Sequence, residues 1–132
     1  MNGNARAAYL DASIATASPA RLLVMLCERL VLDVQRGLDA LLSGDSQESH
    51  RQLTHAQDIV MELRNSLRPD DFKGGTELAA LYGFVYGRLV KANVGKDARL
   101  TDECLTLVTG ICETWRTAAL QSAAVPAGRK SA

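Results

Sequence analysis

Two histidines have the most obvious capacity for chemistry in this sequence, either as metal ligands or as acceptors of a phosphoryl group. His50 and His55 both fall within a stretch of helical periodicity. A di-iron helical bundle needs Glu-x-x-His, but Gln47 and Gln52 occupy the positions three residues before the two histidines. The two imidazoles also lie about 140° apart around a helix, so they cannot easily share one ion. We therefore predict no metal site and no cofactor.

A histidine phosphotransfer domain is also a four-helix bundle, and it needs an exposed histidine with a cation nearby. Asp58 follows His55 by three residues, and its carboxylate would repel a phosphoryl group. His50 precedes Arg51 but falls in the first turn of its predicted helix. A phosphotransfer-type signalling bundle stays open as an alternative on these grounds.

Other catalytic arrangements lack necessary parts. Cys27, Cys104 and Cys112 are embedded in apolar helical patterns, and no pair has the Cys-x-x-Cys spacing of zinc or redox sites. They are typical of reduced thiols that fill a core. The double glycine at 74–75 is not followed by the Lys-Ser/Thr of a phosphate-binding loop. The sequence predicts that the protein is not an enzyme.

Composition narrows the remaining classes of function. The chain has 132 residues, of which 47% are hydrophobic and 23% charged, which suits one globular domain. Fifteen basic and fifteen acidic residues cancel, so nothing attracts nucleic acid or anionic lipid at long range. The sequence shows no secretory h-region and no apolar run of the ~20 residues needed to span a bilayer. We expect a cytoplasmic protein that binds no nucleic acid and does not insert stably into membranes.

Caps and stops divide the chain into helices. Ser18 can cap a helix whose first residue is Pro19, where the missing N–H costs nothing. Apolar residues every three or four positions continue this helix to about Leu42. Asp45 begins the second helix with a capping-box arrangement, and Pro69 stops it.

Two further helices complete the pattern. The third is predicted over about Thr76–Asn93, and the fourth runs from its expected N-cap, Thr101, to about Leu120. Residues 94–99 form the expected loop between them. Four long helices with short connections imply an all-α, antiparallel up-down four-helix bundle.

Two glycines lie inside the third predicted helix. Gly83 and Gly87 each cost about 1 kcal/mol relative to alanine. Either they let another helix approach closely on that face, or they are tolerated at the surface.

The domain organisation follows from this reading. We expect a flap segment at 1–18, the bundle at 19–121 and a disordered tail at 122–132. The third helix carries more apolar surface than one bundle seam needs, so something else must cover part of it. The N-terminal segment, with Tyr9 and Leu10 on a short apolar face, either caps a hydrophobic groove or is a frayed end.

A set of short sequences in a fixed order gives the chain a resemblance to a known family. The set comprises IATASPARLLVML after Tyr9, HAQDIVMELRNSL at 55–67, GGTELAALYGF at 74–84, KAN at 91–93 and a tryptophan near the end of the last helix. Together they resemble FliS, the family of flagellin-specific export chaperones, over about residues 7–118. Two places depart from the family pattern: Cys27 replaces an aromatic residue, and Gly83 begins a Gly-Phe-Val run where Asp, Tyr and Met are usual.

The resemblance implies a function and partners. Members of the family bind the disordered C-terminal region of flagellin in hydrophobic surface grooves, which prevents premature polymerisation. They assist delivery to the flagellar type III export apparatus, so the export gate is an expected second partner. Several members place the N-terminal segment over the same groove when no client is bound. A generic secretion adaptor stays open as an alternative.

Site residues follow from the resemblance and from the apolar stripes together. Those expected to contact the client or support its groove are Ile14, Ala56, Gln57, Ile59, Leu78, Leu81, Tyr82, Leu89 and Asn93. Tyr9 and Leu10 belong to the expected flap. The alternative role for each apolar member is bundle core, and Asn93 could instead be a helix C-cap.

Overall fold

The first two helices begin at the predicted caps. The structure, a computed structural model, describes residues 18–71 and 73–124. Helix α2 spans Pro19–Leu42, and the Ser18 hydroxyl accepts a hydrogen bond from the Arg21 N–H at 3.1 Å. Helix α3 spans Ser46–Ser66, and the Asp45 carboxylate accepts the Glu48 N–H at 3.1 Å. Both N-terminal predictions are confirmed.

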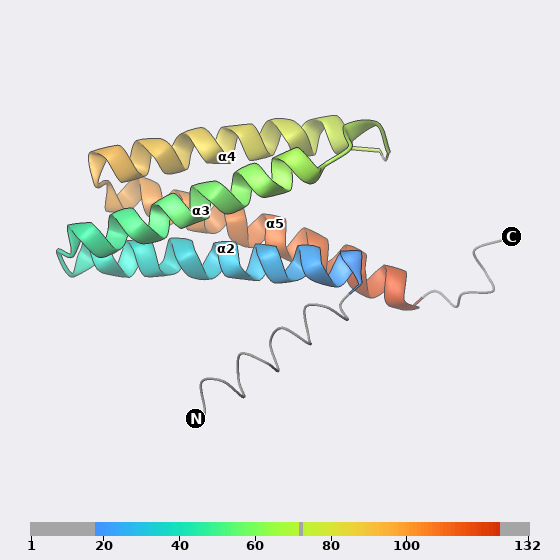
Figure 1. The fold of residues 1–132 in the computed structure, drawn as a ribbon, viewed down its shortest axis with the longest axis horizontal. Helices are drawn as coiled ribbons and strands as arrows, with labels where there is room; N and C mark the ends of the chain where they lie inside the picture. The colour runs from blue at the N-terminus through green and yellow to red at the C-terminus, as the bar shows by residue number, and fades with distance from the viewer. Residues whose placement is uncertain (1–17, 72, 125–132) are drawn as a thin grey trace, which may run out of the picture.

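The remaining elements complete an all-α four-helix bundle, as predicted (Figure 1). A short 3-10 turn, η1 at Pro69–Asp71, leads to α4 at Gly75–Gly95 and α5 at Ala98–Ala124. Helix α2 packs against α3 and α5, and α4 packs against the same two helices. The α2–α3 and α4–α5 connections lie at one end of the bundle, and η1 lies at the other.

The connection between α4 and α5 is shorter than the predicted loop at 94–99. Only Lys96 and Asp97 separate the two helices. Lys96 adopts a left-handed conformation with φ 50°, and the Asp97 N–H then donates to the Ala92 carbonyl at 3.0 Å. This reversal satisfies carbonyl groups at the end of α4 in the manner of a Schellman motif.

The predicted N-cap of the fourth helix was wrong. Asp97 takes that position, and its carboxylate accepts the Leu100 N–H at 3.0 Å. Thr101 is buried inside the helix, and its hydroxyl donates to the Asp97 carbonyl at 2.7 Å. A carboxylate just before the first turn satisfies the free N–H groups there, so the helix starts one turn earlier. Helix α5 also continues beyond Leu120, to Ala124.

Apolar side chains from all four helices meet in one core. Its fully or almost fully buried members include Cys27, Leu30, Val34, Leu53, Val60, Tyr82, Val85, Leu89, Cys104 and Val108.

Two glycines allow neighbouring elements of the bundle to approach closely. A Cβ on Gly37 would lie 2.7 Å from Leu53 Cδ2, and one on Gly75 would lie 2.2 Å from the Pro69 carbonyl oxygen. Gly37 therefore brings α2 against α3, and Gly75 seats the start of α4 on η1.

The two glycines in the interior of α4, Gly83 and Gly87, have no such role among the described residues. A Cβ on Gly87 would have no heavy atom within 4 Å, and one on Gly83 would meet only the Arg64 guanidinium at 3.9 Å. Neither glycine admits a neighbouring helix of the described bundle.

Candidate functional site

An apolar cleft opens at the end of the bundle where α2 begins and α3 ends. Its volume is about 360 Å³. Every element of the bundle contributes to it, and we call it the end cleft. The lining residues are Pro19, Leu23, Leu63, Ser66, Leu67, Arg68, Asp71, Tyr82 and Trp115.

Two hydrogen-bonded aromatic residues from α4 and α5 form part of the cleft wall. The Trp115 indole Nε1–H donates to the Tyr82 hydroxyl oxygen at 2.9 Å. Tyr82 is 1% exposed, whereas Trp115 is half-buried. Burial raises the pKa of Tyr82 to about 12, so the phenol stays protonated at neutral pH. The bond fixes both rings and gives the cleft a defined shape.

Polar side chains line the cleft at the end of α3 and at η1. Ser66, Arg68 and Asp71 line the cleft and are exposed, whereas Leu23 and Leu63 lie deeper. An apolar groove with a polar rim is the usual form of a site that accepts one face of an amphipathic helix.

A second cleft lies beside the first. It has a volume of about 350 Å³ and runs between the start of α2 and the last turns of α5, and we call it the side cleft. Leu120 on its edge is 72% exposed. Arg116 holds the two helices together through Glu28 at 3.0 Å and also pairs with Glu113 on its own helix. Both clefts are bordered by the first turns of α2: Pro19 and Leu23 line the end cleft, and Ala20 and Val24 line the side cleft.

One predicted site residue lines the end cleft, and two more lie near it on the same helix. Tyr82 is part of the cleft wall. Leu78 and Leu81 are half-buried on α4 and pack against the core.

Four other predicted residues lie elsewhere in the bundle. Ala56, Ile59 and Leu89 are buried between helices, where they can support a groove without forming its surface. Gln57 is half-buried on α3.

Asn93 lies at the opposite end of the bundle from the end cleft. Its amide nitrogen is 3.1 Å from His50 Nδ1, and its amide oxygen accepts from Lys96 Nζ at 3.1 Å. Both polar atoms of this almost fully buried amide are therefore engaged, and they tie α3 to the end of α4.

Tyr9 and Leu10 of the predicted flap, and the predicted client-binding residue Ile14, lie outside the described residues.

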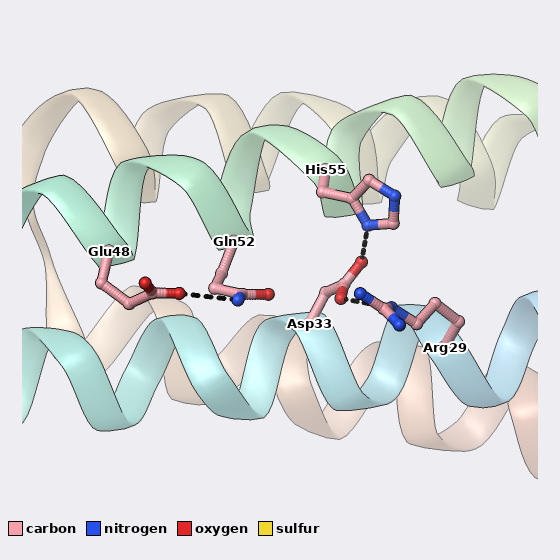
Figure 2. A network of polar contacts seen from close by, with 5 residues as sticks. All are labelled: Arg29, Asp33, Glu48, Gln52 and His55. Atoms are coloured by element: carbon pink, nitrogen blue, oxygen red, sulfur yellow. Dashed lines mark hydrogen bonds and ion pairs between the residues drawn. The ribbon is translucent and has the colours of Figure 1, made fainter. Parts of the chain in front are cut away.

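The second histidine also has a structural partner (Figure 2). Asp33 on α2 is fully buried, and its carboxylate binds both His55 Nδ1 and the Arg29 guanidinium, the latter at 2.9 Å. A carboxylate at the imidazole would repel a phosphoryl group. With His50 engaged by Asn93, neither histidine has the surroundings of a phosphotransfer site.

No group of three or more His, Cys, Asp or Glu side chains could hold a metal ion within residues 18–71 and 73–124. Over the same residues, none of the helices combines the length and the apolar character needed to cross a bilayer.

Sequence reasoning missed most of the residues of the end cleft. Leu23, Leu63 and Trp115 follow the apolar periodicity of their helices, and this periodicity does not distinguish them from its other members. The available signal was Trp115 itself, a large side chain with an N–H to satisfy, placed near the end of the last helix.

Comparisons with known proteins agree with this architecture. The chain matches the family described as "Flagellar protein FliS" over residues 1–122. It is 29% identical over 115 residues to a protein of Bacillus subtilis, covering 87% of this chain and 86% of the relative. It is 30% identical over 112 residues to a protein of Salmonella typhimurium, covering 81% of each chain. A Vibrio cholerae protein is 27% identical over 109 residues, covering 80% of this chain and 79% of the relative. All three relatives are named flagellar secretion chaperone FliS.

Proposed function

The chain belongs to the FliS family of flagellar proteins, and we propose that it is a secretion chaperone whose client is the C-terminal region of flagellin. The observation that carries this proposal is the end cleft, a mainly apolar site of about 360 Å³ at the end of the bundle where α2 begins. The client segment would place the apolar face of a helix in this cleft, and the chain beyond that helix would continue along the neighbouring side cleft.

The free energies involved are compatible with reversible binding. Ordering a disordered segment on binding costs about 2–5 kcal/mol. Burial of roughly 200 Å² of apolar surface offsets the upper figure, at about 25 cal/mol per Å². Contact beyond that area leaves a moderate net affinity, which suits a chaperone that must release its client.

The cellular role follows from covering the flagellin segment. A client held against the bundle cannot polymerise prematurely, and it can be delivered to the flagellar type III export apparatus, whose gate is a second proposed partner. This role belongs in the cytoplasm and requires neither catalysis, nucleic acid nor stable membrane insertion.

The predicted residues take different roles in this proposal. Tyr82 contacts the client together with Leu78 and Leu81, whereas Ala56, Ile59 and Leu89 support the groove from within. The client roles proposed for Gln57 and Asn93 are additional contacts away from the end cleft, and the proposed client contact Ile14 lies outside the described residues.

The proposed flap is the segment at 1–18, with Tyr9 and Leu10 on its apolar face. It would shield the groove in the absence of flagellin. By competing with the client, such a flap lowers the apparent affinity for flagellin.

A calorimetric titration with the C-terminal segment of flagellin from the same organism tests the proposal. The wild-type chain is expected to bind one segment per chain. Ser66→Trp places an indole in the end cleft from an exposed position and should weaken binding at least about tenfold. Ser46→Trp is the matched control, because Ser46 is an exposed serine at the opposite end of the same helix.

Three results would count against the proposal. No binding at high micromolar concentration would remove flagellin as the client. Equal weakening by both substitutions, with unchanged melting, would remove the end cleft as the site. Equal affinity for unrelated secreted proteins would favour a generic secretion adaptor.

A further inference from the structure

Among the described residues, the Tyr82 hydroxyl uses its acceptor function and not its donor function. A tyrosine hydroxyl can accept and donate. Its oxygen accepts the Trp115 indole N–H at 2.9 Å. Within residues 18–71 and 73–124, no acceptor receives the hydroxyl hydrogen. Because the pKa of Tyr82 is raised to about 12, that hydrogen is present throughout the physiological range.

The hydroxyl hydrogen belongs to a buried group in a mainly apolar cleft. Tyr82 is 1% exposed, and Leu23 and Leu63 in the same cleft carry no acceptor. Ser66 and Asp71 also line the cleft, but neither accepts a hydrogen bond from Tyr82. A buried donor without an acceptor is destabilising, so a ligand that supplies an acceptor gains affinity from the site. The indole bond also restricts the rotation of the hydroxyl, because one in-plane direction is already taken by the Trp115 N–H.

We propose that the Tyr82 hydroxyl is the hydrogen-bond donor of the end cleft and that its acceptor is a backbone carbonyl oxygen of the bound flagellin segment. This inference rests on the proposed function and names one specific contact within it. The last four carbonyl groups of a helix have no partner within that helix. A client helix that ends in the cleft, or breaks there, would therefore need such a donor in apolar surroundings.

The consequence is a fixed position for the client. Apolar contacts alone allow a helix to slide by a turn, whereas one directional bond at the wall selects a single position. Because the acceptor is part of the backbone, Tyr82 would recognise where the client helix ends rather than a particular side chain. This explains how one cleft could accept flagellins of different sequence.

Tyr82→Phe tests the inference by removing only the hydroxyl. We expect the affinity for the flagellin segment, measured by calorimetry, to fall roughly five- to tenfold. Tyr86→Phe is the matched control, since Tyr86 lies one turn further along α4, is half-buried and does not line the cleft. It should leave the affinity unchanged. Thermal melting checks that both variants remain folded.

A second measurement uses the wild-type chain and does not depend on how Tyr82→Phe folds. Each amide of the synthetic flagellin segment is replaced in turn by an ester, whose carbonyl is a weaker acceptor. One position is expected to weaken binding to the wild type severalfold and to have no such effect on Tyr82→Phe. This coupling distinguishes a bond to the client from a merely structural effect of the Tyr82–Trp115 pair.

The outcomes separate the two proposals. If the wild type binds the segment and Tyr82→Phe binds it equally well, the inference is overturned and the proposed function stands. Ester effects that are the same in both proteins at every position also overturn it. If the wild type does not bind the segment, both proposals fail together.

Discussion

At the scale of single residues, the buried carboxylate of Asp33 requires polar partners inside the bundle. It has no exposed surface, and its carboxylate contacts the Arg29 guanidinium on the same helix and His55 Nδ1 on α3. Both partners are about half exposed, so each can return to water if the carboxylate is removed. If the two partners are removed instead, Asp33 stays buried, and an unpaired buried charge is strongly destabilising.

This asymmetry predicts a non-additive pair of substitutions. Arg29→Ala or His55→Ala alone leaves Asp33 with one partner and should lower the free energy of unfolding by about 1 kcal/mol. The double variant leaves the charge without either partner and should lose about 3 kcal/mol or more. Urea unfolding of the four proteins measures the difference. Simple additivity would show that Arg29 and His55 do not act together on the buried Asp33 side chain.

The buried thiols predict how stability depends on alkaline pH. Burial raises the pKa of Cys27 to about 12 and that of Cys104 to about 11, compared with about 8.5 for a free thiol. The folded chain therefore keeps protons that the unfolded chain releases. The corresponding stability is fully present below the ordinary thiol pKa and is lost as the pH rises toward the folded values.

The experiment is a series of urea unfolding curves at increasing pH. Each buried thiol should contribute a decline of up to about 1.4 kcal/mol per pH unit above roughly pH 9. Cys27→Ala should have lower stability at neutral pH but a shallower alkaline decline. An identical slope in wild type and variant would contradict the assignment of Cys27 to the core.

At the scale of elements, α2 and α4 contain glycines with opposite relations to their surroundings. Gly37 faces Leu53 so closely that a Cβ would lie 2.7 Å from its side chain, whereas a Cβ on Gly87 would meet nothing within 4 Å. The same substitution should therefore have opposite effects. Gly37→Ala should lower the free energy of unfolding by about 1–3 kcal/mol, and Gly87→Ala should raise it by about 0.5–1 kcal/mol. Thermal and urea unfolding of both variants measure the signs, and a loss of stability in Gly87→Ala would contradict the open surroundings of that position.

Most of the helical elements could be predicted from local sequence, because caps and apolar stripes are local signals. Ser18-Pro19 and Asp45 begin helices where expected. The start of α5 could not be placed in the same way. It depends on Lys96, which adopts a left-handed conformation that glycine favours, although Gly95 stands directly before it. Because the left-handed residue is not a glycine, the sequence does not indicate a reversal at Lys96. The helix start was therefore predicted at Thr101 and not at Asp97.

At the scale of the whole molecule, the end cleft arises where the ends of the helices do not cover one another. Helical periodicity indicates that Leu23, Leu63 and Trp115 lie on the inward faces of their helices. It does not indicate at which end of the bundle a cleft forms. That depends on how η1 and the start of α4 are seated, which is a tertiary property. Tyr82 was predicted as a site residue from the resemblance and the apolar stripe together, whereas Trp115 belonged to both but was not among the predicted site residues.

The proposed function predicts an effect on flagellin assembly. Flagellin mixed with short filament seeds should polymerise, as followed by light scattering. An equimolar amount of the wild-type chain should suppress this growth, because the C-terminal region of flagellin is occupied. Ser66→Trp should suppress it far less, and Ser46→Trp should act like the wild type. Suppression by all three proteins alike would place the inhibitory surface outside the end cleft.

Trp115 provides the most direct test of the central claim that the end cleft binds flagellin. It is the single tryptophan of the chain, it lines the cleft and it is half-buried. Titration with a tryptophan-free C-terminal flagellin segment should shift its fluorescence emission to shorter wavelength and reduce quenching by acrylamide. Both changes should saturate at one segment per chain with the affinity found by calorimetry. Calorimetric binding with unchanged Trp115 emission and quenching would contradict the claim.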